Sequence, residues 1–110
     1  MKDCILRRKE DFDAIYRKGK SSGSRYVVVL YRPNDSGSVR MAFIASKKVG
    51  NSVMRNRARR LMKEAVRLLG FALPEGYDYL FIARNGITDS KCADVKRSIE
   101  AALKRTGLTG

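Results

Sequence analysis

The stretch SVMRNRARRLMKEAVRLL, residues 52–69, concentrates side chains that bind phosphate. Arginines stand at positions 55, 57, 59 and 60, and a planar guanidinium group can hold a phosphate through two parallel hydrogen bonds. Asn56 adds an amide donor among them. Only Glu64 offsets these charges, so they repel one another and lower stability unless an anion compensates. A solvated helix face is the ordinary alternative, but the excess of one sign favours an anion-binding surface.

The charge of the whole chain has the same sign and the same location. Lys and Arg number 24 against 11 Asp and Glu, which gives a net charge of +13. Residues 47–67 hold eight of these basic residues and a single acidic one. Lys47 and Lys48 stand just before the start of the helix, where free N–H groups also attract anions. The imbalance predicts a polyanionic partner, and nucleic acid is the leading candidate.

The residue types that are missing restrict the catalytic chemistry. The chain has no His, which removes the usual proton-transfer residue near neutral pH and the Ser/His and Cys/His nucleophile pairs. Cys4 and Cys92 lack the spacing of a zinc motif or a disulfide framework, so we expect free thiols. The acidic residues are scattered or near helix ends, and no metal site is expected in the protein. The chemistry points to binding and not to hydrolysis by protein side chains.

No segment predicts a membrane protein. No apolar run approaches the roughly 18 residues that cross a bilayer, and the start MKDCILRRKEDF is too charged for a secretory signal. We expect a soluble cytoplasmic protein that folds as one domain over residues 1–110.

Hydrophobic periodicity and turn signals predict six elements. Helical spacing covers residues 9–18, 53–69 and 90–105, and β-branched and aromatic runs cover 25–32, 39–46 and 77–83. The first two strands flank the turn signal PNDSG, so a hairpin is the simplest connection. Ser52 and Gly70 are the expected limits of the middle helix, and Thr88 or Asp89 the cap of the last. This order predicts an α+β fold with helices packed on a small sheet.

The two sides of the middle helix and of the second strand differ in character. The helix has an apolar sector on one side, and opposite it lie Asn56, Arg59, Arg60, Lys63 and Arg67, whereas Arg55 and Arg57 flank the boundary. That sector holds Met54, Ala58, Leu61, Met62, Ala65, Leu68 and Leu69. In the second strand, Met41 and Phe43 form a bulky side, whereas Ala42 and Ile44 lie on a slimmer one. One face of the sheet is therefore expected to stay open as a groove.

Three aromatic residues outside the strand at 77–83 have two interpretations. Phe12 and Tyr16 lie on the first helix, and Tyr26 lies at the start of the first strand. Core packing suits each of them. Their place near basic residues also suits stacking on unpaired bases, which contributes about 1 to 3 kcal/mol per base. The aromatic residues of the strand at 77–83 are expected in the core.

Three segments together resemble one known family. They are EDFDAIYRKGK, SKKVGNSVMRNRARRLMKEAVR and YDYLFIARNG. Residues 55–57 read Arg-Asn-Arg, the RNR motif of the protein subunit of bacterial ribonuclease P, and the likeness runs from about Leu6 to Leu103. In that family the catalyst is an RNA, which uses bound Mg²⁺ to cleave precursor tRNA and leaves a mature 5′ phosphate. The resemblance implies an accessory subunit that binds the catalytic RNA and the single-stranded 5′ leader.

The resemblance also implies which residues meet each RNA. Contact with the catalytic RNA is expected for Lys47, Asn51, Arg55, Asn56, Arg57, Arg59, Arg60, Lys63 and Arg67. A leader cleft between the first helix and the open face of the sheet is expected to be lined by Phe12, Tyr16, Val28, Leu30, Ile44 and Lys48. No catalytic residue is implied in the protein, and the Mg²⁺ of the holoenzyme is expected to be held mainly by RNA.

The family fold is a two-layer sandwich of the order αβββαβα, like the second domain of ribosomal protein S5. It contains a left-handed crossover from the strand at 39–46 through the arginine helix to the strand at 77–83. General chirality favours the opposite hand, which about 98% of parallel crossovers adopt. The family also has one further short strand, and residues 19–24 are its expected place.

Two other functions remain open on the residues alone. A ribosome-associated RNA-binding protein can share a basic sandwich, and the RNA that co-purifies would separate the two. A basic amphipathic helix can lie on anionic lipid, but residues 53–69 lack Trp and Phe and their apolar side is needed by the sheet. The expected partners are therefore the catalytic RNA and precursor tRNA, with neither a membrane nor DNA.

Overall fold

The computed structural model describes residues 4–5, 9–34 and 36–108, without the side chains of residues 4 and 5. The elements in chain order are β1 (Cys4–Ile5), α1 (Lys9–Lys18), β2 (Lys20–Gly23), β3 (Val27–Pro33), β4 (Val39–Ile44), α2 (Ser52–Arg67), β5 (Tyr77–Ala83), the 3-10 helix η1 (Ile87–Asp89) and α3 (Cys92–Thr106). The helix at 9–18 and the strand at 77–83 have the predicted bounds. The further short strand expected near residues 19–24 is β2, and β1 is a strand that the sequence does not predict.

The strands form one five-stranded sheet in the order β1-β4-β5-β3-β2. Strand β5 pairs in parallel with β4 and antiparallel with β3, so the predicted hairpin between the first two strands is wrong. The physical reason is burial on both faces. Tyr79, Leu80 and Phe81 of β5 are fully buried, and both faces of a strand are covered most readily in the middle of the sheet, where helices pack above and below it.

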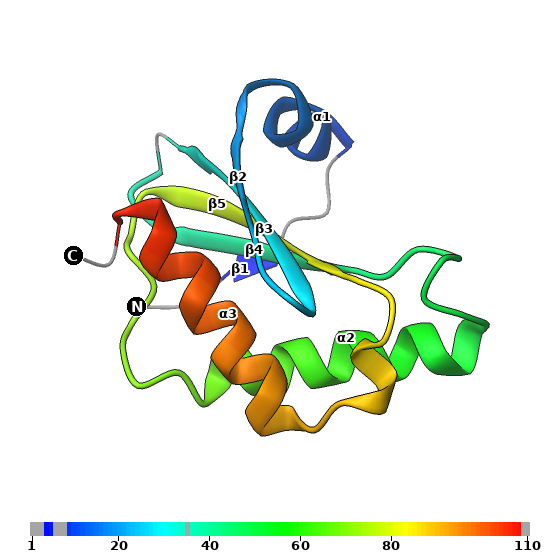
Figure 1. Cartoon of the computed structure of the whole chain (residues 1–110). Helices are drawn as coiled ribbons and strands as arrows, with labels where there is room; N and C mark the ends of the chain where they lie inside the picture. The colour runs from blue at the N-terminus through cyan, green and yellow to red at the C-terminus, as the bar shows by residue number, and fades with distance from the viewer. Residues whose placement is uncertain (1–3, 6–8, 35, 109–110) are drawn as a thin grey trace.

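Helices cover the two faces of the sheet unequally (Figure 1). Helices α2 and α3 pack on one face and contact each other, whereas α1 packs on the opposite face against β3 and β5. The predicted α+β sandwich is confirmed. The connection from β4 through α2 to the parallel strand β5 is left-handed, as the family resemblance implies and against the general preference (Figure 1).

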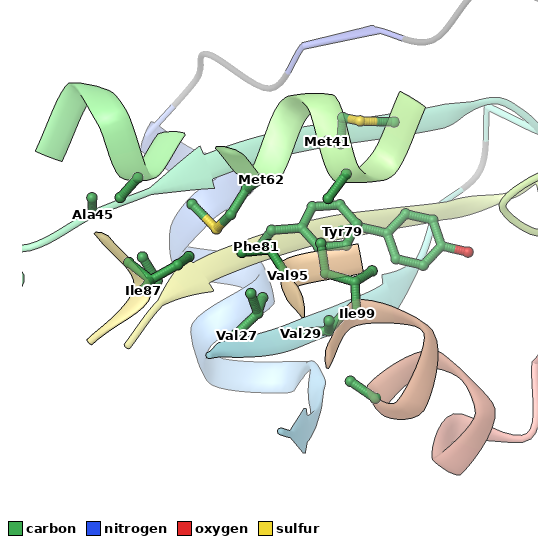
Figure 2. Packing of buried hydrophobic residues seen from close by; sticks show 14 of the residues in the cluster. Val27, Val29, Met41, Ala45, Met62, Tyr79, Phe81, Ile87, Val95 and Ile99 are labelled. Carbon is green, nitrogen blue, oxygen red and sulfur yellow. The ribbon is translucent and has the colours of Figure 1, made fainter. Parts of the chain in front are cut away.

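The main core lies between the sheet and the pair α2 and α3 (Figure 2). The rings of Tyr79 and Phe81 stack with centroids 6.1 Å apart at its centre. Met62 of α2 and Ile99 of α3 are fully buried in this layer. A smaller cluster on the other face joins Ile15 of α1 to the sheet. Tight packing of both layers makes the sheet a rigid platform for the surfaces of α1 and α2.

The ends of α2 differ from the prediction. Met54 and Leu68, expected on the apolar sector, are 38% and 46% exposed, because the buried positions of the helix begin at Ala58 and end at Ala65. The N-cap is Asn51 and not Ser52, since its side-chain oxygen accepts a hydrogen bond from the backbone N–H of Met54 at 3.0 Å. The helix ends at Arg67, before the predicted stop at Gly70.

The start of α3 also differs from the prediction. Thr88 and Asp89, the expected caps, belong to η1, which forms its own short turn. Lys91 is the N-cap, and its backbone N–H donates to the carboxylate of Asp94 at 3.2 Å. A side chain three residues into the helix therefore satisfies the free N–H group.

Candidate nucleic-acid interface

Helix α2 turns its basic residues away from the core. Its buried positions are Ala58, Met62 and Ala65, which form one stripe against the sheet. The rest of the helix surface, called here the basic side of α2, consists of exposed Asn56, Arg57, Arg60, Lys63 and Arg67, with half-buried Arg55 and Arg59 at its borders. The sheet covers the apolar stripe, so the guanidinium groups stay accessible to a partner.

Internal contacts hold part of the basic side in place. Arg59 donates to the side-chain oxygen of Asn56, and Nε of Arg57 donates to the carbonyl of Thr88 at 3.3 Å. Nε of Arg55 is buried without a hydrogen-bond partner among the described residues, which lowers stability. Because only Glu64 offsets the like charges of this helix, the arginines repel one another in the free protein, and an anionic partner would relieve that repulsion.

Helix α2 has one acidic residue, and this residue neutralises charge only at one end of the helix. Glu64 pairs with Arg67 three residues later, and this hydrogen bond holds the pKa of the Glu64 carboxyl below its usual value. Both side chains lie at the C-terminal end of α2. The formal positive charge of α2 is accordingly not offset over residues 55–63.

The turn before α2 adds two cations at its N-terminus. Lys47 and Lys48 are exposed in a tight turn that follows β4, closed by the N–H of Gly50 donating to the carbonyl of Lys47 at 3.2 Å. Gly50 adopts φ +146°, a conformation that side chains rarely adopt, and a Cβ there would lie 2.4 Å from the sulfur of Met54. Asn51 is exposed, but its side-chain oxygen is occupied by the helix cap. Only its amide N–H₂ group can be offered to a partner.

On the opposite face of the sheet, four apolar side chains form a strip across three strands. The strip consists of Val28 and Leu30 of β3, Ile44 of β4 and Ile82 of β5. Ile82 pairs with both Val28 and Ile44, and all four side chains are only half-buried. Ile82 was not among the predicted leader contacts, although it lies two residues beyond buried Leu80 and therefore on the same face.

Helix α1 lies next to this apolar strip. Ile15 is fully buried on the sheet, and Phe12 and Leu30 pack around the same small cluster. Tyr16 points away and is 54% exposed. Lys48, exposed beyond the end of β4, is the only predicted leader contact with a charge. The structure thus brings Phe12 and Leu30 into one cluster and leaves Tyr16 free to meet a partner.

A buried ion pair fixes strands β4 and β5 beneath α1. Arg40 donates to both carboxylate oxygens of Asp78 at 2.7 Å, and Asn34 donates to the same carboxylate at 2.8 Å. Asp78 is 1% exposed. The guanidinium group of Arg40 also lies 3.6 Å from the carboxylate of Asp11 on α1. The position of α1 relative to the apolar strip therefore depends in part on a single arginine.

The described part of the chain has neither a metal-binding cluster nor a membrane-spanning helix. No group of three or more His, Cys, Asp or Glu side chains that could hold a metal occurs among the described residues. Cys92 is a half-buried free thiol, and the side chain of Cys4 lies outside the described residues. No helix among residues 9–34 and 36–108 is long and apolar enough to cross a bilayer.

Comparison with known proteins identifies the family to which the chain belongs. The family model described as Ribonuclease P matches residues 1–107. The chain belongs to the ribonuclease P protein family. Members of the family are components of ribonuclease P, the endoribonuclease of tRNA 5′ maturation, so the predicted function is confirmed and a ribosome-associated role is not favoured.

Relatives of the ribonuclease P family match along most of their length. The ribonuclease P protein component of Pelotomaculum thermopropionicum is 44% identical over 94% of this chain and 93% of its own. The protein component of Clostridioides difficile is 40% identical over 94% and 92%. Among solved structures, the ribonuclease P protein of Staphylococcus aureus superposes with a TM-score of 0.84 at 29% identity, over 99% and 100% of the two chains. That of Thermotoga maritima gives 0.80 at 30% identity, over 92% and 96%.

Proposed function

We propose that the two surfaces divide the work of the ribonuclease P protein between two RNAs. The basic side of α2, with Lys47 and Asn51, binds the catalytic RNA of the ribonucleoprotein. The apolar strip beside α1, with Phe12, Tyr16 and Lys48, binds the single-stranded 5′ leader of precursor tRNA. The observation that carries the proposal is the opposition of the two surfaces across one sheet, which lets both be occupied at once (Figure 1).

The chemistry of each surface suits its proposed partner. Arginine forks recognise phosphates without reading sequence, as a folded RNA backbone requires. Exposed Tyr16 of α1 and the half-buried aliphatic groups of the strip beside it suit the faces of unpaired bases. Lys48 can pair with the leader backbone at the end of the strip.

The protein supplies binding and orientation, and the hydrolytic chemistry belongs to the RNA. Each role that the described residues support is one of contact with phosphate or base. We infer that the Mg²⁺ ions of the holoenzyme are held mainly by RNA, because Mg²⁺ prefers phosphate oxygens and water as ligands and RNA supplies the phosphates. The cytoplasm, where precursor tRNA is processed in bacteria, is the proposed location.

Arg60→Ala tests the contact with the catalytic RNA. Arg60 is exposed and forms no ion pair among the described residues, so the variant should fold normally. The slope of log affinity against log salt for the catalytic RNA should fall by about 0.7 to 0.9, the share of one neutralised phosphate. Lys104→Ala on α3 removes the same charge from an exposed position outside the proposed surface and should leave the slope unchanged. An unchanged slope in Arg60→Ala would remove this residue from the interface.

Tyr16→Ala tests the contact with the leader. Because Tyr16 is more than half exposed, its loss should leave folding intact. Affinity of the holoenzyme for precursor tRNA should fall about fivefold or more, the equivalent of one lost stack, whereas affinity for mature tRNA should stay constant. Tyr16→Phe keeps the ring and should bind like the parent. Equal losses for precursor and mature tRNA would rule out a specific leader contact.

A further inference from the structure

A second cationic site lies away from both proposed surfaces, between α3 and the turn that joins β2 to β3. It is a hollow of about 340 Å³. Its lining consists of Ser24, Arg25, Tyr26, Asp94, Arg97, Ser98, Ala101 and Arg105. Neither the basic side of α2 nor the apolar strip contributes to it.

Hydrogen bonds between distant segments hold the turn in place on α3. The hydroxyl of buried Ser98 lies 2.5 Å from the hydroxyl of Ser24 and accepts a hydrogen bond from the backbone N–H of Tyr26 at 3.0 Å. Arg84 donates to the carbonyl of Ser24 at 2.8 Å, and Arg105 donates to that of Gly23. The hollow is therefore formed before any ligand arrives, which reduces the entropy lost on binding.

The cations around the hollow outnumber its single carboxylate. Arg25, Arg97 and Arg105 are all exposed. Among the described residues, Arg97 pairs with Asp94 at 2.5 Å, whereas neither Arg25 nor Arg105 has a carboxylate within ion-pair distance. The backbone N–H of Lys91 and the Arg97 guanidinium hold the pKa of Asp94 below its usual value, so this carboxylate stays ionised and competes with any anion for Arg97.

An aromatic ring gives the hollow a second kind of recognition. The guanidinium carbon of Arg25 lies 5.3 Å from the ring centroid of Tyr26 and covers that ring. A flat guanidinium above an aromatic ring is a platform on which a nucleobase can continue the stack. An acidic peptide would use the charges but not the platform.

We propose that this hollow binds one nucleotide of a single-stranded RNA segment. The phosphate lies between Arg97 and Arg105, and the base stacks on the pair Arg25 and Tyr26. The proposal requires the chain to work in a ribonucleoprotein, as its family does, but neither of the surfaces proposed above. The hollow would be a third RNA-binding site of the protein, on the α3 side of the molecule.

The test measures binding of a fluorescent oligouridylate to the full-length protein. Arg60→Ala and Lys63→Ala form the background, so that the basic side of α2 contributes less to the signal. Arg97→Ala and Arg105→Ala should each weaken binding severalfold and lower the salt slope by about 0.7. Asp94→Asn keeps an oxygen for the helix cap and removes the competing charge, so it should tighten binding. Lys104→Ala, on the same helix but outside the lining, is the matched control and should change the affinity less than either arginine variant.

Four results would overturn the proposal, and thermal melting of each variant excludes loss of folding as their cause. The first is unchanged affinity in both arginine variants. The second is an equal loss in Lys104→Ala, which would indicate bulk charge. The third is competition by polyglutamate as strong as by unlabelled oligouridylate, which would indicate an acidic protein. The fourth is binding of free uridine monophosphate as tight as that of the oligomer, which would indicate a free nucleotide. Because every variant is compared in the α2-substituted background, these outcomes are independent of whether α2 docks on the catalytic RNA.

Discussion

Replacement of Arg40 by Met removes the charged partner of buried Asp78 and should destabilise the fold. Met keeps the aliphatic length of the arginine stem, so little packing is lost. What is lost is the pair of 2.7 Å hydrogen bonds to the Asp78 carboxylate, which is 1% exposed. The carboxylate must then stay charged in a poorly solvated place or take up a proton.

The magnitude follows from the surroundings of the pair. Removing one partner of a buried ion pair typically costs about 3 to 5 kcal/mol. The side chain of Arg40 is 28% exposed and Asn34 still donates to Asp78, so the loss should lie near the lower limit, about 3 kcal/mol. For a domain of this size, such a loss corresponds to a fall in Tm of about 12 °C.

Urea denaturation followed by circular dichroism measures this loss, and two further variants make it specific. Arg32→Met is the matched control, because Arg32 is the cross-strand neighbour of Asp78 on β3 but forms no hydrogen bond with it. It should cost less than about 1 kcal/mol. In the double variant Arg40→Met with Asp78→Asn, the loss of unfolding free energy should be smaller than the sum of the two single losses by about 1 to 3 kcal/mol. The reason is that no uncompensated charge remains.

A free energy of unfolding for Arg40→Met within 1 kcal/mol of that of the parent protein would contradict this prediction, and so would an equally unstable Arg32→Met. Either result would mean that Asp78 is solvated or compensated without Arg40. Additive losses in the double variant would likewise show that the two side chains do not stabilise each other.

Two further predictions concern the backbone at the ends of the helices. Gly19→Ala should lower the free energy of unfolding by more than about 1 kcal/mol, because the new Cβ would lie 2.4 Å from the carbonyl oxygen of Ile15 and 3.0 Å from that of Tyr31; a thermal melt equal to that of the parent would contradict this. Asn51→Ala should lower the free energy of unfolding by about 1 kcal/mol, because the backbone N–H of Met54 loses its cap. Asn51→Asp keeps a capping oxygen and should have the stability of the parent in urea denaturation.

Local sequence determined the features that depend only on the spacing of neighbouring residues. The helix at 9–18 and the strand at 77–83 have the predicted bounds, and exposed Arg60, Lys63 and Arg67 of α2 lie opposite the buried stripe of Ala58, Met62 and Ala65. Helical periodicity fixes which side chains share a face, whatever the helix packs on. The excess of positive charge on that face was visible for the same reason.

Tertiary structure decided everything that depends on pairing between distant segments. Strand β5 inserts between β3 and β4, which no local turn signal shows. The same insertion places Asp78 beside Arg40, 38 residues away, and Ile82 between Val28 and Ile44. Strand order is set by which surfaces can be buried together. A local pattern of alternating residues shows which face of a strand is buried, but not which strand lies beside it.

The hollow beside α3 is the clearest example of a feature that the sequence alone does not predict. Its defining contact joins Ser24 to Ser98, 74 residues apart, and its arginines are spread over positions 25, 97 and 105. In the sequence these residues look like an ordinary turn and the mixed-charge face of a helix. The sequence alone could locate a basic surface on one continuous helix, whereas a basic surface assembled from a turn and a distant helix exists only once the sheet has brought them together.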